Sequence, residues 1–233
     1  MRFATWNVLH RVHAENWYEE VAVRWPDEAA RIAAVAERVA ELDAAVIALQ
    51  EVSGDQLVAL RAVAGERTVH TLRYPRVPRP KRVPTVLRER DEYLVVLAGP
   101  ESVPVFGAAF GDDPGKGALV VRAGEFTVVA THVTGDRRGS GQLAALADLA
   151  EGGPAVLLGD FNADRATVAA GLGPKFAVAE LPPERPTRPR TGAGKSQFID
   201  HIVTRGAVAA AVRVLDGGGL SDHNPVCGTV SAG

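Results

Sequence analysis

Cysteine is nearly absent from this 233-residue sequence, in which Cys227 is the single thiol. One cysteine excludes a disulfide framework within the chain and a zinc site built from several cysteines. Long apolar runs are missing too, since no segment approaches the roughly 20 consecutive apolar residues that a membrane-spanning helix needs. We therefore expect no association with a membrane.

The sequence also shows no secretory signal. Residues Met1–Thr5 lead directly into a strand-like run, without the basic region, apolar stretch and cleavage site of an export signal. On this basis we expect a cytoplasmic location.

A large excess of one charge is also missing, because the formal net charge is −2. The cations are nevertheless concentrated in the sequence. The arginine-rich arm (residues 73–92) holds seven of them between Arg73 and Arg90, against the single acid Glu89. Guanidinium groups bind phosphate through paired hydrogen bonds, and Tyr74 is expected to stack on a base. The arm therefore favours a nucleic-acid partner, whereas the net acidic balance favours cations that only solvate exposed loops.

Apolar residues are abundant in the sequence, at 46% of the total, which is enough for a sizeable core. Helical periodicity over Asp27–Leu42 and a capping-box pattern at Ser53 alternate with strand-like runs, which indicates an α/β fold. We find no linker that divides the chain. The prediction is one domain over residues 1–233, with loops rich in arginine and proline at residues 73–92 and 181–196.

Polar motifs occur where predicted strands end. In order, these motifs are Thr5–Asn7, Gln50–Glu51, Thr131–His132, Gly159–Asn162 and Ser221–Asn224, with Ile199–His201 before the last of them. Each motif alone is weak, because polar residues after a strand are also ordinary turn formers. Their combination is what a metal-assisted phosphoester hydrolase requires.

Asp160 and Asn162 follow an apolar strand two residues apart, so an extended backbone places both on one side. A carboxylate can activate water while a neighbouring amide holds a phosphate oxygen. Glu51 also ends an apolar run, where a carboxylate is costly unless it is paired or bound to a cation. Because Mg²⁺ prefers oxygen ligands and few protein carboxylates, Glu51 is a candidate metal ligand, with Asn7 as a neutral one.

Two histidines are candidates for proton transfer. His223 has a possible carboxylate partner in Asp200, and such a partner fixes the tautomer and stabilises the imidazolium. His132, which ends a predicted strand, is the second candidate. The sequence alone does not decide whether Asp160 or the Asp200–His223 pair activates water. His10, His13 and His70 give no comparable signal.

At these residues the sequence resembles the endonuclease/exonuclease/phosphatase superfamily, the deoxyribonuclease I-like enzymes, from Phe3 to Val226 and with the motifs in family order. The resemblance implies a four-layer α/β sandwich in which two mixed β-sheets pack face to face between helices. It also implies a divalent-metal-dependent phosphoric ester hydrolase that uses Mg²⁺ or Mn²⁺.

The resemblance further implies roles for individual residues. Metal positions of the family match Asn7, Glu51 and Asp222. Catalytic positions match His132, Asp160, Asn162, Asp200 and His223. Asp91 is the nearest match to the carboxylate that supports the His132 position in deoxyribonuclease-like members.

The leading hypothesis is a Mg²⁺-dependent nuclease acting on nucleic acid, with RNA favoured and with Arg and Lys of the loops contacting phosphates. One alternative is a phosphatase or phosphodiesterase for a small phosphorylated metabolite or a lipid headgroup. The other is a binding module without activity, which the complete set of matched positions disfavours. The oligomeric state is not predicted.

Overall fold

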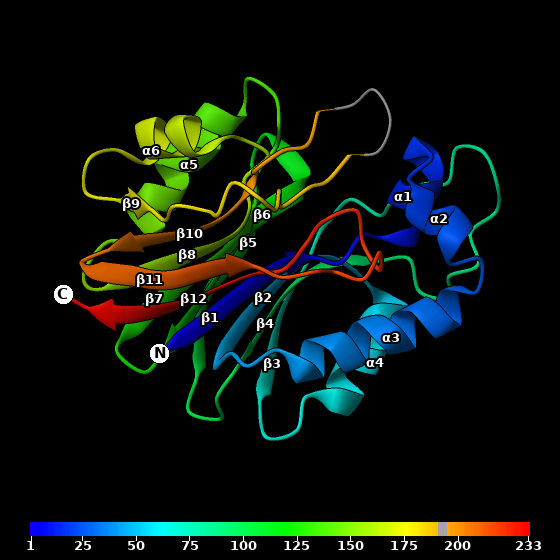
Figure 1. The fold of residues 1–233 in the computed structure, drawn as a ribbon, viewed down its shortest axis with the longest axis horizontal. Coiled ribbons are helices and arrows are strands. Elements are labelled where there is room, and N and C mark those ends of the chain that lie inside the picture. The colour runs from blue at the N-terminus through cyan, green and yellow to red at the C-terminus, as the bar shows by residue number, and fades with distance from the viewer. Residues whose placement is uncertain (191–194) are drawn as a thin grey trace.

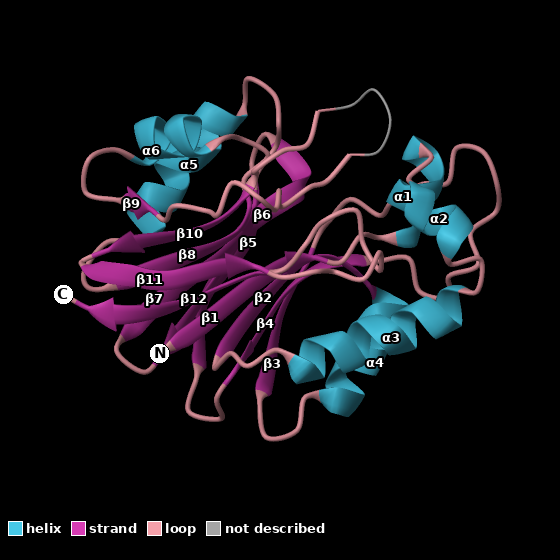
Figure 2. Ribbon diagram, viewed as in Figure 1, coloured by secondary structure: helices cyan, strands magenta, loops and turns pink. Residues whose placement is uncertain are grey.

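The computed structural model describes residues 1–190 and 195–233, and its strands form two mixed six-stranded sheets (Figures 1 and 2). The first sheet has the order β11 (Ala207–Val214), β12 (Val226–Ala232), β1 (Arg2–Asn7), β2 (Val46–Ser53), β4 (Glu92–Ala98) and β3 (Thr68–Arg73). The second has the order β5 (Val103–Phe110), β6 (Asp113–Ala123), β7 (Phe126–His132), β8 (Ala155–Asp160), β10 (Asp200–Arg205) and β9 (Ala177–Val178).

The helices lie outside the sheets (Figure 2). Their bounds are α1 (Arg11–Trp17), α2 (Glu20–Arg24), α3 (Glu28–Glu41), α4 (Gly54–Val63), α5 (Gly139–Leu149) and α6 (Arg165–Leu172). Helices α3 and α4 cover the first sheet and α5 and α6 the second, whereas α1 and α2 lie beyond the strand ends (Figure 1).

Side-chain alternation along the strands produces the layers. Phe3 of β1 lies between the two sheets, and Ala4 faces the outer helices. In β8, Leu158 lies between the sheets and Leu157 faces α5 and α6. Strands buried on both faces read as continuous apolar runs, which is why the sequence shows no simple alternation there. The four-layer sandwich expected from the family resemblance is confirmed.

Several predicted elements are confirmed. The helix expected over Asp27–Leu42 is α3, and Asp27 caps it by accepting from the amide of Ala30 at 3.1 Å. The capping box at Ser53 is present in full. Its hydroxyl accepts from the amide of Gln56, and the Gln56 side chain accepts from the amide of Ser53.

The prediction for Tyr74 is wrong. Its side chain is only 1% exposed and lies in the core between the sheets, so it is not available to stack on a base. Tyr74 directly follows β3, and its amide bonds to Glu92 of β4, which draws the residue into the sandwich. The remainder of the arm runs without regular structure to β4.

The second predicted loop, residues 181–196, is also irregular where it is described, and residues 191–194 lie outside the described part. None of the helices in residues 1–190 and 195–233 has the length and apolar character needed to span a bilayer.

Candidate active site

Strand ends from both sheets meet at one rim of the sandwich. In the first sheet β1 runs parallel to β2 and ends with Asn7 opposite Gln50 of β2. In the second sheet, Asp160 of β8 pairs with both His132 and Asp200. This register explains why motifs far apart in the sequence converge: Asn7, His132 and Asp160 end strands and Asp200 begins one at the same edge.

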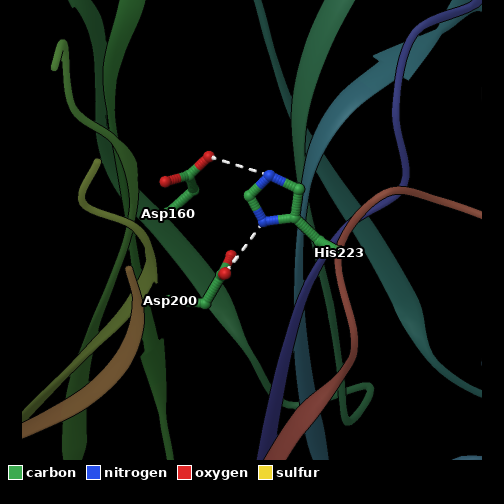
Figure 3. A group of neighbouring side chains, drawn as sticks. All are labelled: Asp160, Asp200 and His223. Carbon is green, nitrogen blue, oxygen red and sulfur yellow. Dashed lines mark hydrogen bonds and ion pairs between the residues drawn. The ribbon is translucent and has the colours of Figure 1, made fainter. Parts of the chain in front are cut away.

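Asp160, Asp200 and His223 form a buried group at this rim (Figure 3). His223 Nδ1 lies 2.8 Å from Asp200 Oδ2, and His223 Nε2 lies 3.8 Å from Asp160 Oδ2. Burial lowers the pKa of His223, but Asp200, Asp222 and Asp160 outweigh it and raise that pKa to about 10. The imidazole therefore carries a proton at neutral pH, held between carboxylates.

The loop that carries His223 is fastened to β1. The Ser221 hydroxyl donates to the carbonyl of Asn7 at 2.7 Å and accepts from the amide of His223 at 3.1 Å. The indole of Trp6 donates to the carbonyl of His223 at 2.9 Å. These bonds explain the serine of the last motif, which positions the histidine rather than reacting.

Glu51 lies inside β2, at an irregularity in its pairing with β4, and its φ is +57°. A glutamate in this left-handed conformation is uncommon, and such strain is concentrated at functional sites. Burial raises the pKa of Glu51, but His13, His132 and Lys116 lower it further, so the pKa lies well below its usual range. Glu51 is thus a carboxylate at neutral pH.

Two amides surround Asp160. Asn7 Nδ2 donates to its Oδ2 at 3.1 Å, and the backbone amide of Asn162 donates to its Oδ1 at 2.8 Å. Burial raises the pKa of Asp160, but the hydrogen bond with His132 and the charge of His223 hold that pKa well below its usual range. Asn162 has a φ of +48°, and its side chain donates to the carbonyl of Val133 at 3.0 Å.

His132 lies among charged groups. Its Nε2 is 3.4 Å from Asp160 Oδ2 and 3.9 Å from Glu51 Oε1, and it contacts the ammonium of Lys116. Its Nδ1 is buried and has no hydrogen-bond partner within the described residues. Asp91, expected beside this histidine, forms an ion pair with Arg73 at 2.9 Å instead, because both lie on the solvent side of the arm.

Asp222 faces an arginine in this structure. Its Oδ2 lies 2.7 Å from Arg188 Nη2, and Arg188 also pairs with Glu19 at 3.0 Å. The other oxygen of Asp222 is buried and has no hydrogen-bond partner in residues 1–190 and 195–233. Asp222 therefore lies at the site, with one oxygen occupied and one unpaired.

Sequence reasoning missed several residues that the fold brings to the site. The half-buried His13 of α1 pairs with the buried Glu92 at 2.9 Å, and His13 lies close enough to Glu51 to lower its pKa. Burial lowers the pKa of His13, but Glu92 and Glu51 raise it above its usual value. Lys116 directly precedes Gly117, the β6 residue opposite His132, and only this cross-strand register reveals it.

A pocket of about 950 Å³ opens over these residues. Its floor contains Glu51, His132, Asp160, Asn162, Asp222 and His223. Its walls contain Trp17 of α1, residues of the arm and the pair Arg188 and Arg190. The pocket thus combines carboxylates and imidazoles at its base with cations around its mouth.

The donor set of the site fits a hard divalent cation. Glu51 and Asp160 supply ionised carboxylates, and Asn7 supplies an amide oxygen. Unpaired buried oxygens of Asp200 and Asp222 add further acceptors in the described structure. Oxygen ligands of this kind suit Mg²⁺ or Mn²⁺ rather than a soft metal.

Comparison with known proteins agrees with this geometry. The model of the Endonuclease/Exonuclease/phosphatase family matches residues 4–223. No curated protein matches the chain significantly. Among solved structures, a functionally unknown conserved protein from Enterococcus faecalis V583 is 20% identical, with a TM-score of 0.71 and 100% of both chains covered.

Two further structures are similar in fold. TDP2 from D. rerio, complexed with single strand DNA product, is 14% identical with a TM-score of 0.71, and the match covers 100% of this chain and 99% of that one. The human Nocturnin catalytic domain with bound sulfate anion is 16% identical with a TM-score of 0.68, covering 100% and 93%.

Proposed function

The chain belongs to the endonuclease/exonuclease/phosphatase family of metal-dependent phosphoric ester hydrolases, and we propose that it is a Mg²⁺-dependent nuclease. One observation carries the proposal. Asp160 and His223 of the buried group line a pocket that is also lined by cations, including Arg76, Arg79 and Lys81, and Asp200 lies behind them, bonded to His223. Such a pocket matches a polyanion with a phosphodiester to be cleaved. RNA is the favoured substrate, and DNA is the competing one.

Charge states favour Asp160 as the group that activates water. Asp160 is ionised at neutral pH, whereas the raised pKa of His223 leaves its imidazole protonated and unable to accept a proton. Because its pKa is held well below its usual range, Asp160 is a weak base, and its role is to orient the attacking water and to accept its proton as the bond to phosphorus forms. Asn162, bonded to Asp160 through its backbone, would place its side-chain amide near a phosphate oxygen.

The protonated His223 would stabilise charge on the phosphoryl group. Asp200 holds the imidazole through Nδ1 at 2.8 Å, which leaves Nε2–H directed toward Asp160 and the pocket. A fixed donor aimed at developing negative charge is worth more in a buried site than in water. Asp200 acts as a positioning residue for that donor.

Glu51, with Asn7 and Asp222, would hold the metal ion. When bound, a divalent ion neutralises charge on a phosphate and lowers the energy of the leaving oxygen. Lys116 and His132, which contact one another beside Glu51, would donate to that leaving oxygen.

A substrate panel tests the proposal. Wild-type protein would be incubated with single-stranded RNA, single-stranded DNA, duplex DNA and simple phosphomonoesters, in Mg²⁺ and in excess chelator. We expect Mg²⁺-dependent cleavage of at least one single-stranded polymer. Hydrolysis of phosphomonoesters without any polymer cleavage would instead favour the alternative, a phosphatase for a small phosphorylated metabolite or a lipid headgroup.

Asp160→Asn serves as the loss-of-function variant in this panel, and Glu125→Gln serves as its control because Glu125 is an exposed acid in the turn between β6 and β7. Retention of full cleavage by Asp160→Asn would contradict the assigned role of Asp160.

A further inference from the structure

An exposed tryptophan lies at the wall of the pocket. Trp17 is the last residue of α1, and its side chain is 67% exposed even though indole surface is favourable to bury. It lines the same pocket as Asp160 and His223. A large aromatic left open to solvent beside a reaction site points to a ligand that covers it.

The arm is fastened to α1 beside this tryptophan. Asn16 Nδ2 donates to the carbonyl of Arg79 at 3.0 Å, and Asn16 Oδ1 accepts from the amide of Lys81 at 2.9 Å. The ammonium of Lys81 lies 5.1 Å from the centre of the Trp17 ring, which is within cation–π range. Trp17 and the arm therefore form one wall, with most of the indole still exposed.

The end of α1 fixes where this ring stands. Tyr18 adopts a left-handed conformation, with φ of +56°, and its amide bonds to the carbonyl of Ala14, which terminates the helix. The guanidinium of Arg82 stacks 4.0 Å from the Tyr18 ring and bonds to its hydroxyl. The arm is thus bonded to residues on both sides of Trp17, which holds the Trp17 ring and the arm in a fixed relative position.

Charges on this wall suit a phosphate beside the ring. Arg79 and Lys81 are exposed and line the pocket. Arg76, also in the lining, is paired with Asp113 at 3.3 Å, so it is already partly neutralised. A flat aromatic surface next to two exposed cations matches a flat base joined to a phosphate.

We infer that Trp17 is a stacking platform for a nucleobase adjoining the phosphate to be cleaved, with Arg79 and Lys81 contacting a neighbouring phosphate. This inference deepens the proposed nuclease function and rests on it for the identity of the substrate. Trp17 is thereby a specificity-determining residue, and substrates without bases lose its contribution. The base belongs either to a polynucleotide or to a free nucleotide.

The test compares wild type, Trp17→Ala and Trp17→Phe on a single-stranded oligonucleotide and on an abasic oligonucleotide of equal length. Phe106→Ala is the matched control, since Phe106 is an exposed aromatic on β5 outside the pocket lining. We expect Trp17→Ala to lower kcat/KM on the oligonucleotide by about tenfold, chiefly through KM. Cleavage of the abasic polymer should not change, and Trp17→Phe should recover most of the loss.

An equal loss on both polymers would overturn the inference, because Trp17 would then act on folding or geometry alone. No loss on either would overturn it as well, while leaving the nuclease proposal intact.

A binding experiment distinguishes this result from failure of the nuclease proposal. If wild type cleaves no polymer, titration with a nucleoside monophosphate and with ribose 5-phosphate in chelator decides the matter. Weaker binding of the nucleotide alone to Trp17→Ala supports the platform for a free nucleotide, and identical binding by both proteins overturns it.

Discussion

At the scale of single residues, His10 shows how a buried imidazole is held neutral. Its Nδ1 accepts from the amide of Val12 at 3.2 Å and so caps α1, and its Nε2 lies 3.2 Å from the carbonyl of Arg90. This pattern requires Nε2–H and a free Nδ1 lone pair, so protonation would remove the cap. Burial lowers the pKa of His10 to about 4, and Glu92 and Glu51 oppose that shift only in part.

The depressed pKa predicts a loss of stability in acid. Between pH 6.5 and about 4, the unfolded chain binds a proton at His10 that the native chain does not. As the pH decreases through that window, the free energy of unfolding therefore decreases, and His10 contributes roughly 3 kcal/mol to this loss. His10→Asn keeps a side chain suited to capping but does not titrate, so its stability should decline less steeply.

Urea unfolding at several pH values across that window measures the effect. Parallel pH profiles for wild type and His10→Asn would show that His10 does not carry the linkage.

The site residues differ in how visible they are in the sequence. Asp160, Glu51 and Asn7 were predictable because each occurs in or directly after an apolar strand, where burial of a polar side chain costs free energy unless the side chain is paired or bound to an ion. Lys116 and His13 were not, since a lysine inside a strand and a histidine near the N-terminus are ordinary. Only cross-strand register and the packing of α1 bring these two to the site.

At the scale of elements, the pairing of β7 with β8 leaves no room for a side chain at Gly159. Gly159 lies opposite Thr131, and a Cβ there would come within 2.1 Å of the Thr131 carbonyl oxygen. The close pairing of β7 and β8 thus requires glycine at position 159. This pairing places Asp160, the last residue of β8, beside His132.

Gly159→Ala should destabilise the protein by about 1–3 kcal/mol or more, because backbone has to move in a buried strand. Gly153→Ala is the control, since a Cβ at Gly153 meets nothing within 4 Å. In thermal unfolding, Gly159→Ala should have a clearly lower Tm than wild type, and Gly153→Ala should have nearly the wild-type Tm. Equal Tm values for the two variants would refute the close-approach argument.

Element prediction succeeded where local signals were complete. The Ser53 capping box and the Asp27 cap locate the starts of α4 and α3. Helices α1 and α2 were missed because 7 and 5 residues are too few to show a periodic apolar face. The apolar run that the sequence shows ends before Glu51, whereas β2 continues through the irregularity at Glu51 to Ser53.

At the scale of the whole molecule, charge is separated between the floor and the mouth of one pocket. Carboxylates gather at the strand ends, and cations of the arm line the same pocket, as do Arg188 and Arg190, which both pair with Glu19. A net charge of −2 hides this arrangement. Composition alone therefore does not reveal this local arrangement of charge.

This separation predicts salt-dependent binding of single-stranded oligonucleotides. Measured with the Asp160→Asn variant to prevent cleavage, log affinity should fall linearly with log salt, with a slope of about −0.7 for each phosphate contact. Arg79→Gln combined with Lys81→Gln should reduce the magnitude of the slope by about 1.4. A slope near zero, or one unchanged by the two substitutions, would contradict phosphate contact by the arm.

The most direct test of the central claim is the rate of Mg²⁺-dependent oligonucleotide cleavage by a protein carrying both Asp160→Ala and His223→Ala. We expect a loss on the order of 10² or more relative to wild type, with circular dichroism showing that the fold is retained. We also expect chelator to reduce the wild-type rate to the same background. Cleavage at the wild-type rate by the doubly substituted, folded protein would show that Asp160 and His223 are not the catalytic groups.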